Sequence, residues 1–420
     1  MTDKENITTA ENTDIGNIRL TDRLSRFLLF RVLEKITVGC LTFSEGEEKH
    51  TFGNINSELQ AHIRVYDYRT YASIAYKGSI GAGESYFKGM WDSENLTNVI
   101  RIFAVNMKVL DKMDDYLAIF TKPFYRLGAK SRKNTVNTAK QNIMMHYDLG
   151  NDMYETFLDE SMMYSSGFYA SPNHSLAEAQ TEKLEKICQA LGLQSEDHVV
   201  EIGSGWGGFA IHAAKNYGCR VTTTTISDAQ FEYASKRIKA MGLEDRITIL
   251  NKDYRLLEGH YDKLVSIEMI EAVGLEFYHQ YFNKCSSLLK PNGKMLIQAI
   301  TIADQRFERY RRSTDFIQKY IFPGGELPSL EYITRKVCSS SNMVIRKIDD
   351  FGTHYAQTLR DWRHRFLANK PKLIAKAFDD QFIRLWEFYL CYCEAAFMER
   401  TTSVVHVVMD KYQFTENPVS

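Results

Sequence analysis

A glycine-rich turn near the middle of the chain is the segment best suited to bind a ligand. Its sequence is Val199-Val-Glu-Ile-Gly-Ser-Gly-Trp-Gly-Gly208, an apolar run followed directly by closely spaced glycines. Glycine lets the backbone approach a ligand closely because it has no Cβ, and such turns lie at the carboxyl edge of an open α/β sheet, where ligands bind. Gly203, Gly205 and Gly208 match the G-x-G-x-x-G spacing of dinucleotide sites. Glu201 before them also gives the E-x-G-x-G shape that is typical of S-adenosylmethionine sites.

The residues after the next strand help to decide between these ligands. A nicotinamide enzyme usually has Asp or Glu at the end of the second strand, where it binds the ribose hydroxyls. Here that position falls in Thr222-Thr-Thr-Thr-Ile-Ser-Asp-Ala-Gln230, and its acidic residue, Asp228, lies beyond the strand near a predicted helix N-cap. Thr225 and Gln230 are neutral and can bond a ribose or an amino-acid group, which favours S-adenosylmethionine.

These residues need a scaffold, and from about residue 142 helices and strands alternate along the chain. Apolar periodicity predicts helices at 176–191, 206–216, 228–241 and 276–289. It predicts strands at 198–202, 220–225, 247–250, 263–267 and 294–299. Strands that alternate with helices of this length indicate βαβ units and a parallel, doubly wound sheet, hence an α/β fold. A helix at 379–399 and a strand at 403–410 follow.

The N-terminal part has a different pattern. Residues 1–19 are predicted to be a disordered tail, and residues 20–121 a small α+β domain. This domain is expected to contain a helix at 20–36, strands at 39–43, 49–52 and 59–65, a glycine-rich stretch at 78–86 and a helix from about 95 to 120. Residues 122–141 are basic without an acidic residue and are interpreted as a linker before a catalytic domain at 142–420. The linker is either a solvated connector or a segment that rests on anionic lipid, where each cation contributes ~1 kcal/mol.

The composition limits the classes of function. Hydrophobic residues make up 44% of the 420 residues, and the net charge is −1, so the chain can bury a large core and is not a polycation that coats nucleic acid. No run approaches the roughly 20 apolar residues of a membrane span, and the N-terminus lacks the basic and apolar regions of a signal peptide. The seven cysteines are scattered without a CxxC pair, which predicts reduced thiols and no metal site.

Six motifs stand in order along the chain and together resemble one family. They are His146-Tyr-Asp-Leu-Gly-Asn-Asp152, Tyr164-Ser-Ser166, Glu201-Ile-Gly-Ser-Gly-Trp-Gly-Gly208, Thr225-Ile-Ser-Asp-Ala-Gln230, Ser266-Ile-Glu-Met-Ile-Glu-Ala-Val-Gly274 and Lys319-Tyr-Ile-Phe-Pro-Gly-Gly325. Over about residues 20–410, the chain resembles the cyclopropane-fatty-acyl-phospholipid synthases and the mycolic acid cyclopropane synthases. The Gly83-Glu-Ser-Tyr86 segment resembles the N-terminal, lipid-contacting domain of the phospholipid-acting branch. The resemblance implies a class I S-adenosylmethionine methyltransferase fold, a Rossmann-like doubly wound sheet preceded by the small α+β domain.

The resemblance also implies a reaction. An alkene carbon of an unsaturated phospholipid acyl chain attacks the methyl group of S-adenosylmethionine, and a carbocation forms on the neighbouring carbon. A base then removes a proton from the new methyl group as a cyclopropane ring closes, and the family is implied to hold bicarbonate as that base. Since the sulfonium is already activated, the protein mostly supplies orientation, a dry site and stabilisation of the cation.

The resemblance assigns roles to individual residues. Glu271 and Tyr355 stand at the positions of the catalytic Glu and Tyr, whereas Ser166 stands where the family has Cys and Gln298 where it has His. Ser and Gln can still donate hydrogen bonds to bicarbonate, but the exchange of His removes one proton acceptor. The residues implied to bind S-adenosylmethionine are Tyr164, Ser165, Glu201, Gly203, Gly205, Thr225, Gln230, Asp253 and Tyr254.

These exchanges leave other functions open. A carbocation that does not close a ring can lose a different proton, so a C-methyltransferase that makes methyl- or methylene-branched acyl chains is the main alternative. A lipid- or S-adenosylmethionine-binding protein without turnover is a third hypothesis, and a nicotinamide dehydrogenase is a fourth. Residues 303–330 are expected to form a lid, with aromatics that line an acyl channel and arginines that either face solvent or bind phosphate. The lid residues concerned are Arg306, Arg309, Arg311, Arg312, Phe316, Tyr320 and Phe322.

The expected substrate sets the expected location. Because an acyl chain lies in a bilayer, we expect a cytoplasmic enzyme that binds the inner face of the cell membrane peripherally, through amphipathic and basic surfaces. A homodimer would provide two such contacts. We expect no nucleic-acid partner.

Overall fold

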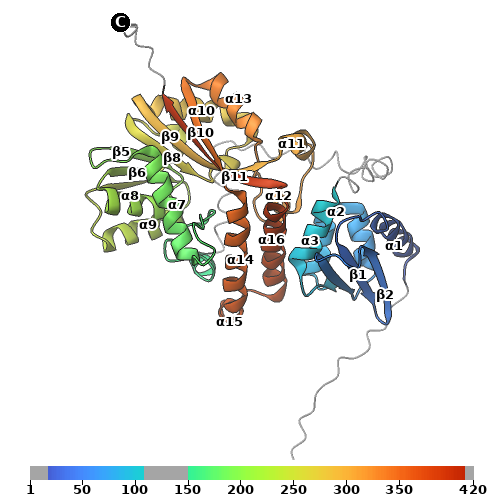
Figure 1. Cartoon of the computed structure of the whole chain (residues 1–420). Helices are drawn as coiled ribbons and strands as arrows, with labels where there is room; N and C mark the ends of the chain where they lie inside the picture. Colours follow the sequence, from blue (N-terminus) through green and yellow to red (C-terminus); the bar gives the residue numbers. More distant parts are fainter. Residues whose placement is uncertain (1–17, 108–149, 412–420) are drawn as a thin grey trace, which may run out of the picture. The chain divides into compact units, whose positions relative to one another are not determined.

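The computed structural model describes residues 18–107 and 150–411. The predicted basic linker at 122–141 and most of the predicted tail at 1–19 lie outside these residues. The chain divides into two compact units, residues 1–119 and 120–420 (Figure 1), and each unit has a β-sheet of its own.

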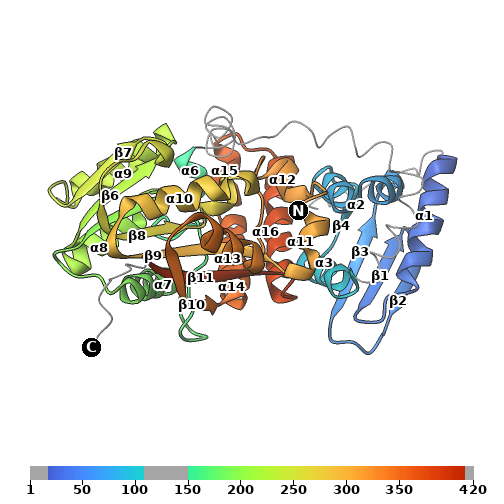
Figure 2. The same ribbon diagram turned by 90° about the horizontal axis from the view of Figure 1, so that it is seen from above.

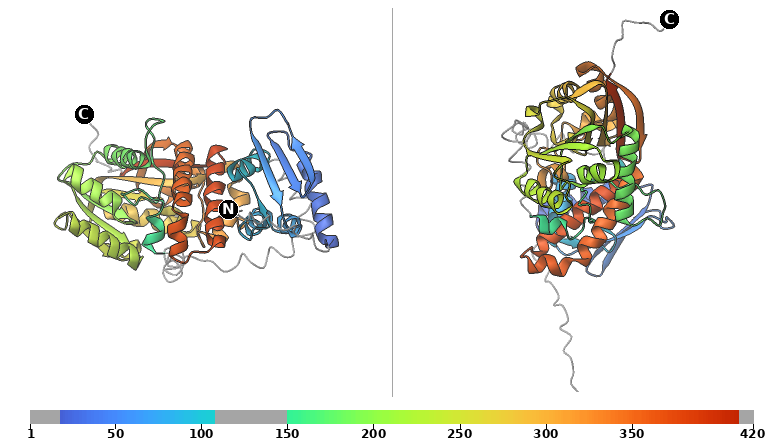
Figure 3. Two further views of the ribbon diagram at one scale, coloured as in Figure 1. Left: turned by 90° about the horizontal axis from the view of Figure 1, so that it is seen from below. Right: turned by 90° about the vertical axis from the view of Figure 1, so that its left-hand side faces the viewer.

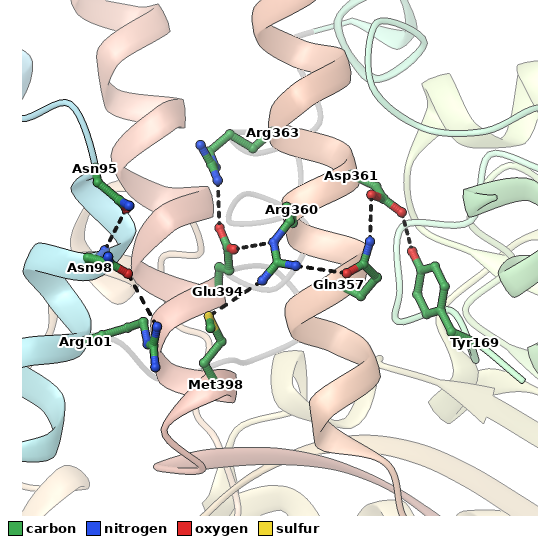
Figure 4. A network of polar contacts seen from close by, with 10 residues as sticks. All are labelled: Asn95, Asn98, Arg101, Tyr169, Gln357, Arg360, Asp361, Arg363, Glu394 and Met398. Carbon is green, nitrogen blue, oxygen red and sulfur yellow. Dashed lines mark hydrogen bonds and ion pairs between the residues drawn. The ribbon is translucent and has the colours of Figure 1, made fainter. Parts of the chain in front are cut away.

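The N-terminal unit contains a four-stranded sheet in the order β2-β1-β3-β4. β1 (Cys40–Glu45) pairs antiparallel with β2 (Glu48–Gly53) and parallel with β3 (Gln60–Val65), which also pairs with β4 (Trp91–Asp92). The helices are α1 (Leu20–Leu33), α2 (Arg69–Phe87) and α3 (Leu96–Val105), and the predicted helix at 95–120 is described only as far as α3. Asn95 begins α3 by accepting a hydrogen bond from the backbone N–H of Asn98 at 3.1 Å (Figure 4). The core of this unit includes Leu33, Leu41, Phe43, Tyr71 and Ile102.

The glycine-rich stretch forms the C-terminal half of α2. The helix is kinked at Gly78, whose φ is 56° and ψ −131°. At Gly81 a Cβ atom would lie 1.9 Å from the backbone oxygen of Ser73, so only glycine permits this close approach. Trp91 donates from Nε1 to Ser85 Oγ at 3.0 Å and thereby joins β4 to the same half of the helix.

The C-terminal unit is a seven-stranded sheet in the order β10-β11-β9-β8-β5-β6-β7. The predicted parallel, doubly wound arrangement is confirmed for β5 to β9, while β11 runs antiparallel to both β9 and β10. The strands are β5 (His198–Ile202), β6 (Arg220–Thr225), β7 (Ile247–Asn251), β8 (Tyr261–Ile267), β9 (Leu289–Ile302), β10 (Met343–Asp350) and β11 (Thr402–Lys411). The longer helices that connect them are α7 (Leu176–Leu191), α8 (Gly208–Tyr217), α9 (Asp228–Ala240), α10 (Tyr278–Leu288) and α13 (Leu330–Ser340).

Both faces of this sheet are covered by helices (Figure 2). Neighbouring residues of one strand point to opposite faces, so Val199 packs in the cluster with α7, α8 and α9, and Val200 in the cluster with α10 and α13. Val265 and Leu264 divide in the same way on β8. This explains why β5 and β8 have adjacent apolar residues rather than an alternating pattern. The carboxyl ends of β5, β6, β7 and β8 therefore meet along one edge.

A helical excursion lies between β10 and β11 in the chain (Figure 3). It consists of α14 (Gly352–Ala368), α15 (Lys370–Ala375) and α16 (Asp380–Met398). Glu394 on α16 is 2% exposed and accepts hydrogen bonds from Arg360 Nε at 2.9 Å and from Arg363 at 3.1 Å (Figure 4). These two arginines of α14 neutralise the buried carboxylate and fix the helix pair. Within the two described stretches, no helix combines the length and apolar character that crossing a membrane requires.

Candidate active site

The glycine turn after β5 leaves space beside its backbone. Gly203 and Gly205 have φ angles of +94° and +49°, a left-handed conformation that other residues rarely adopt. A Cβ atom on Gly205 would meet nothing within 4 Å, and α8 begins three residues later, at Gly208. The turn therefore offers an open place beside bare backbone and the N-terminus of a helix, as a bound cofactor requires.

Polar side chains follow β6 and β7 at the same edge of the sheet. Thr225 donates from Oγ1 to Gln230 Oε1 at 2.9 Å, and both residues are buried. Asp253, after β7, is 8% exposed, and its carboxylate is held by the guanidinium of Arg255 at 2.6 and 2.9 Å. Tyr254 is partly buried beside this pair. The structure thus brings the predicted residues of three strand ends to one edge, with Asp253 already engaged by a cation.

Two ionisable residues, Glu201 near the end of β5 and Lys183 on α7, are buried. Glu201 is 2% exposed and accepts from Thr223 Oγ1 at 2.6 Å. Lys183 on α7 is completely buried and donates from Nζ to Ser165 Oγ at 2.7 Å. Burial raises the pKa of Glu201 to about 8, against the Thr223 hydrogen bond and the charge of Lys183. Burial also lowers the pKa of Lys183 to about 8, against the attraction of Glu268, Asp159 and Glu201.

Replacing Glu201 with glutamine is expected to flatten the pH dependence of the free energy of unfolding. The folded-state pKa of Glu201 is about 8 and the unfolded value is about 4.3, so between these values the folded state binds more protons. Stability is therefore lost as the pH rises through this range, by up to about 1.4 kcal/mol per pH unit. Urea unfolding at about pH 5.5 and about pH 7.5 measures the slope. The exposed Glu244→Gln variant should keep the wild-type slope, and an unchanged slope in Glu201→Gln would contradict the burial argument.

Three of the four predicted catalytic residues converge on one carboxylate. Glu268 Oε1 accepts from the backbone N–H of Ser166 at 2.9 Å and from Gln298 Nε2 at 2.7 Å. Glu268 Oε2 accepts from Tyr355 OH at 2.7 Å. Glu268 follows β8 with a φ of +47°, a left-handed conformation that costs roughly 1–2 kcal/mol in a residue other than glycine. Desolvation by the surrounding protein raises the pKa of Glu268, against the three hydrogen bonds and the charge of Lys183.

Gln298 is held in place by a histidine on the neighbouring strand. His406 on β11 pairs in register with Gln298 on β9, and its Nε2 lies 2.9 Å from Gln298 Oε1. Burial lowers the pKa of His406 to about 3, so the ring is neutral. With the proton on Nε2, the ring donates to Oε1 and directs the amide nitrogen of Gln298 toward Glu268.

Glu271 lies on the one-turn helix η2 (Ile270–Ala272), three residues after Glu268. Its Oε1 accepts from the backbone N–H of Ile300 on β9, and its buried Oε2 has no hydrogen-bond partner. Burial raises the pKa of Glu271 to about 8, and the charge of Glu268 adds to this effect. A buried carboxyl oxygen without a partner has a high free-energy cost, so this atom points to a group that the protein alone does not supply.

Aromatic side chains enclose Tyr164. Its hydroxyl lies 2.9 Å from that of Tyr389, and its ring centroid lies 5.2 Å from Trp362 and 6.1 Å from Phe322. Within the expected lid, which contains α11 (Asp304–Tyr310) and α12 (Phe316–Tyr320), Phe316 is fully buried against Phe388 at 4.7 Å. The aromatics thus form a packed apolar wall that excludes water.

The arginines of the expected lid differ from its aromatics. Arg311 and Arg312 are exposed to solvent and pair with Glu308.

Sequence reasoning missed three residues of this site: Glu268, Lys183 and His406. Glu268 stands inside a motif used for the resemblance, but its position three residues from Glu271 gives no sign of its hydrogen bonds. Lys183 looks like an ordinary polar residue of an amphipathic helix. His406 could have been found, because a histidine within a predicted apolar strand is unusual.

Comparison with known proteins identifies the family. The model of the family described as mycolic acid cyclopropane synthetase matches residues 134–407. Tuberculostearic acid methyltransferase UfaA1 of Mycobacterium tuberculosis is 38% identical over 349 residues, which cover 81% of this chain and 79% of that protein. Cyclopropane-fatty-acyl-phospholipid synthase of Escherichia coli is 35% identical over 361 residues, 85% of this chain and 90% of that protein.

Solved structures agree with these relatives. Mycolic acid cyclopropane synthase CmaA1, complexed with S-adenosylhomocysteine, superposes with a TM-score of 0.61 at 27% identity and covers 65% of this chain and 98% of its own. The cyclopropane synthase MmaA2 of Mycobacterium tuberculosis has the same TM-score at 25% identity, with the same coverage. The open place at Gly205 fits S-adenosylmethionine as the methyl donor. The chain belongs to the mycolic acid cyclopropane synthetase family, enzymes that use S-adenosylmethionine to cyclopropanate or methylate lipid acyl chains.

Proposed function

We propose that the protein methylates a double-bond carbon in an unsaturated phospholipid acyl chain and releases a methyl- or methylene-branched chain. One observation carries this proposal: Ser166, Gln298 and Tyr355 all donate to Glu268. Gln298, which stands where the family has His, contacts Glu268 with its side chain, whereas Ser166 contacts it only through its backbone N–H. The exchange of His for Gln therefore removes a titratable group beside this carboxylate. The name of the relative with 38% identity, a tuberculostearic acid methyltransferase, supports branching rather than ring closure.

The residues of the site suit each step of this reaction. S-adenosylmethionine supplies an activated methyl group, which Gly203, Gly205 and Gln230 would hold at the edge of the sheet. The alkene carbon forms a bond to the methyl carbon as the S–C bond breaks, which leaves S-adenosylhomocysteine and a carbocation on the neighbouring carbon. The aromatic side chains around Tyr164 exclude water that would otherwise add to the carbocation. A carbon next to the cationic carbon then loses one proton, and the product is a neutral alkene.

Cyclopropanation is the second candidate. The Escherichia coli synthase aligns over 85% of this chain at 35% identity, nearly as well as the methyltransferase. Both reactions share the methyl transfer and differ only in which C–H electron pair neutralises the cation. If that pair comes from the new methyl group and bonds to the cationic carbon, the ring closes.

The products distinguish the two reactions. Liposomes of monounsaturated phospholipid are incubated with enzyme and S-adenosylmethionine, and the fatty acids are analysed by mass spectrometry and NMR. We expect a gain of one CH2 with olefinic signals, accompanied by those of a methyl group on the double bond or of a methylene branch. High-field ring protons would establish the synthase instead. Release of S-adenosylhomocysteine without any lipid product, or no release at all, would contradict both and favour the binding-protein hypothesis.

Peripheral membrane contact belongs to the same proposal. α1 exposes Leu20, Leu24 and Phe27 by 83%, 56% and 60%, one helical turn apart, with Arg23 and Arg31 on the same helix. An apolar stripe beside basic residues suits the interface of an anionic bilayer. Binding to anionic liposomes, measured by flotation, should weaken at high salt because salt screens the basic residues. The proposed homodimer is a separate question, which analytical ultracentrifugation would test.

A further inference from the structure

We propose that the carboxylate of Glu268 is the resident base of this enzyme and takes the place that the resemblance gives to bicarbonate. The inference rests on the proposed methyl transfer to an alkene, and it names the group that receives the proton. It also predicts that the wild-type enzyme works without bicarbonate.

The hydrogen bonds of Glu268 show why a separate anion does not fit. The resemblance assigns Ser166, Gln298 and Tyr355 to the pocket of the bound anion. Their donors are a backbone N–H, an amide NH2 and a phenol, and all three are directed at the oxygens of Glu268. A bicarbonate ion would have to displace this carboxylate and then lie next to it, and two anions repel each other strongly in a partly buried site.

The geometry leaves Glu268 able to accept a proton. A carboxylate has about four lone-pair directions. Oε1 uses two of them, for Ser166 and Gln298, whereas Oε2 uses one, for Tyr355. One direction on Oε2 therefore stays available to a substrate proton.

The backbone of Glu268 points to function as well. Its φ of +47° is strained for a residue with a side chain. Glycine would adopt this conformation freely, but it would leave the three donors without an acceptor. A strained residue that satisfies three converging donors is typical of a functional site rather than of a core position.

The charges around Glu268 fit a base. The positive charge of Lys183 favours the ionised form of Glu268. Glu268 and Glu271 are close enough for the charge of Glu268 to raise the pKa of Glu271. Desolvation raises the proton affinity of Glu268, and the neutral His406 holds Gln298 without adding a charge. In the proposed step a C–H bond of the carbocation breaks, its electron pair forms the new C–C bond or C=C bond, and the proton passes to Oε2 of Glu268.

The test compares Glu268→Gly with the wild type in buffer freed of carbon dioxide and in the same buffer with millimolar bicarbonate. Removing the side chain exposes the three donors and relieves the strain, so the variant should gain a bicarbonate site. We expect 13C NMR to detect binding of labelled bicarbonate to Glu268→Gly and not to the wild type. Turnover of the variant should fall about 100-fold without bicarbonate and recover when bicarbonate is added, while wild-type turnover stays unchanged.

Two further variants keep the test decisive. Glu268→Gln fills the same space without a basic oxygen, so it should lose turnover, keep its affinity for S-adenosylhomocysteine and not respond to bicarbonate. The exposed Glu276→Gln variant should behave like the wild type. Wild-type turnover that depends on bicarbonate, or full turnover in Glu268→Gln, would overturn the proposal. If the wild type modifies no lipid, the proposed function fails, and the bicarbonate-binding measurement still decides whether Glu268 fills the anion site.

Discussion

Glu271→Gln is expected to lower turnover about 100-fold and to leave the affinity for S-adenosylhomocysteine unchanged. The carboxyl group of Glu271 has one oxygen on the backbone N–H of Ile300 and one buried oxygen without a partner. A negative charge on this second oxygen would stabilise a carbocation forming in the pocket, where little water is present to screen it. The amide of glutamine keeps the shape and the contact with Ile300 but cannot carry the charge.

The pH profile provides a second measurement of the same role. The pKa of Glu271 is about 8 because the group is buried and lies near Glu268. Single-turnover rates of the wild type should therefore rise as the pH approaches this value, and Glu271→Gln should lack the rise. Glu276→Gln serves as the matched control, since it makes the same exchange on an exposed residue a few positions later. Unchanged turnover in Glu271→Gln would remove Glu271 from the mechanism.

Gly205→Val is expected to weaken binding of S-adenosylmethionine by about 100-fold or more. Valine is poorly compatible with a φ of +49°, and its side chain would fill the open space beside the turn, where we place the cofactor. The expected loss corresponds to about 2.7 kcal/mol of binding free energy. Isothermal titration with S-adenosylhomocysteine measures this loss directly.

A control variant at another glycine distinguishes two effects of Gly205→Val, the filling of the cofactor space and the backbone strain of a positive φ. Gly242 follows α9 with a φ of +64°, and a Cβ atom there would also meet nothing within 4 Å. Gly242→Val should therefore destabilise the protein by a similar amount and leave cofactor affinity unchanged. Equal affinity in the two variants would contradict a cofactor position beside Gly205.

The scaffold was largely predictable, because most strands of the doubly wound sheet are short apolar or β-branched runs between helices of clear periodicity. The predicted strand at 294–299 was too short, since β9 extends from Leu289 to Ile302, and β11 runs against its neighbours. Single-sequence patterns do not report strand direction. The glycine-rich stretch at 78–86 was not assigned to an element because a kink at Gly78 and close packing at Gly81 hide the helical pattern.

The site was predictable only as a set of residues and not as a network. Ser166, Gln298 and Tyr355 were found by resemblance, yet the group that joins them, Glu268, depends on a left-handed backbone conformation that no propensity indicates. Likewise, the contact between Gln298 and His406 exists only because β11 pairs with β9 over a separation of 108 residues. Long-range pairing and backbone strain are the two features that local patterns do not encode.

The late position of β11 in the chain has a consequence for how the enzyme matures. The strand that orients Gln298 is synthesised only after α14 and α16, although it lies inside the sheet between β9 and β10. While residues 402–411 are still inside the ribosome, a growing chain already contains the glycine turn and Glu268. It cannot yet place His406 against Gln298, the residue that donates to Glu268. Nonsense mutations between Glu268 and Thr402 should thus give chains that contain the cofactor turn and lack the histidine that orients Gln298.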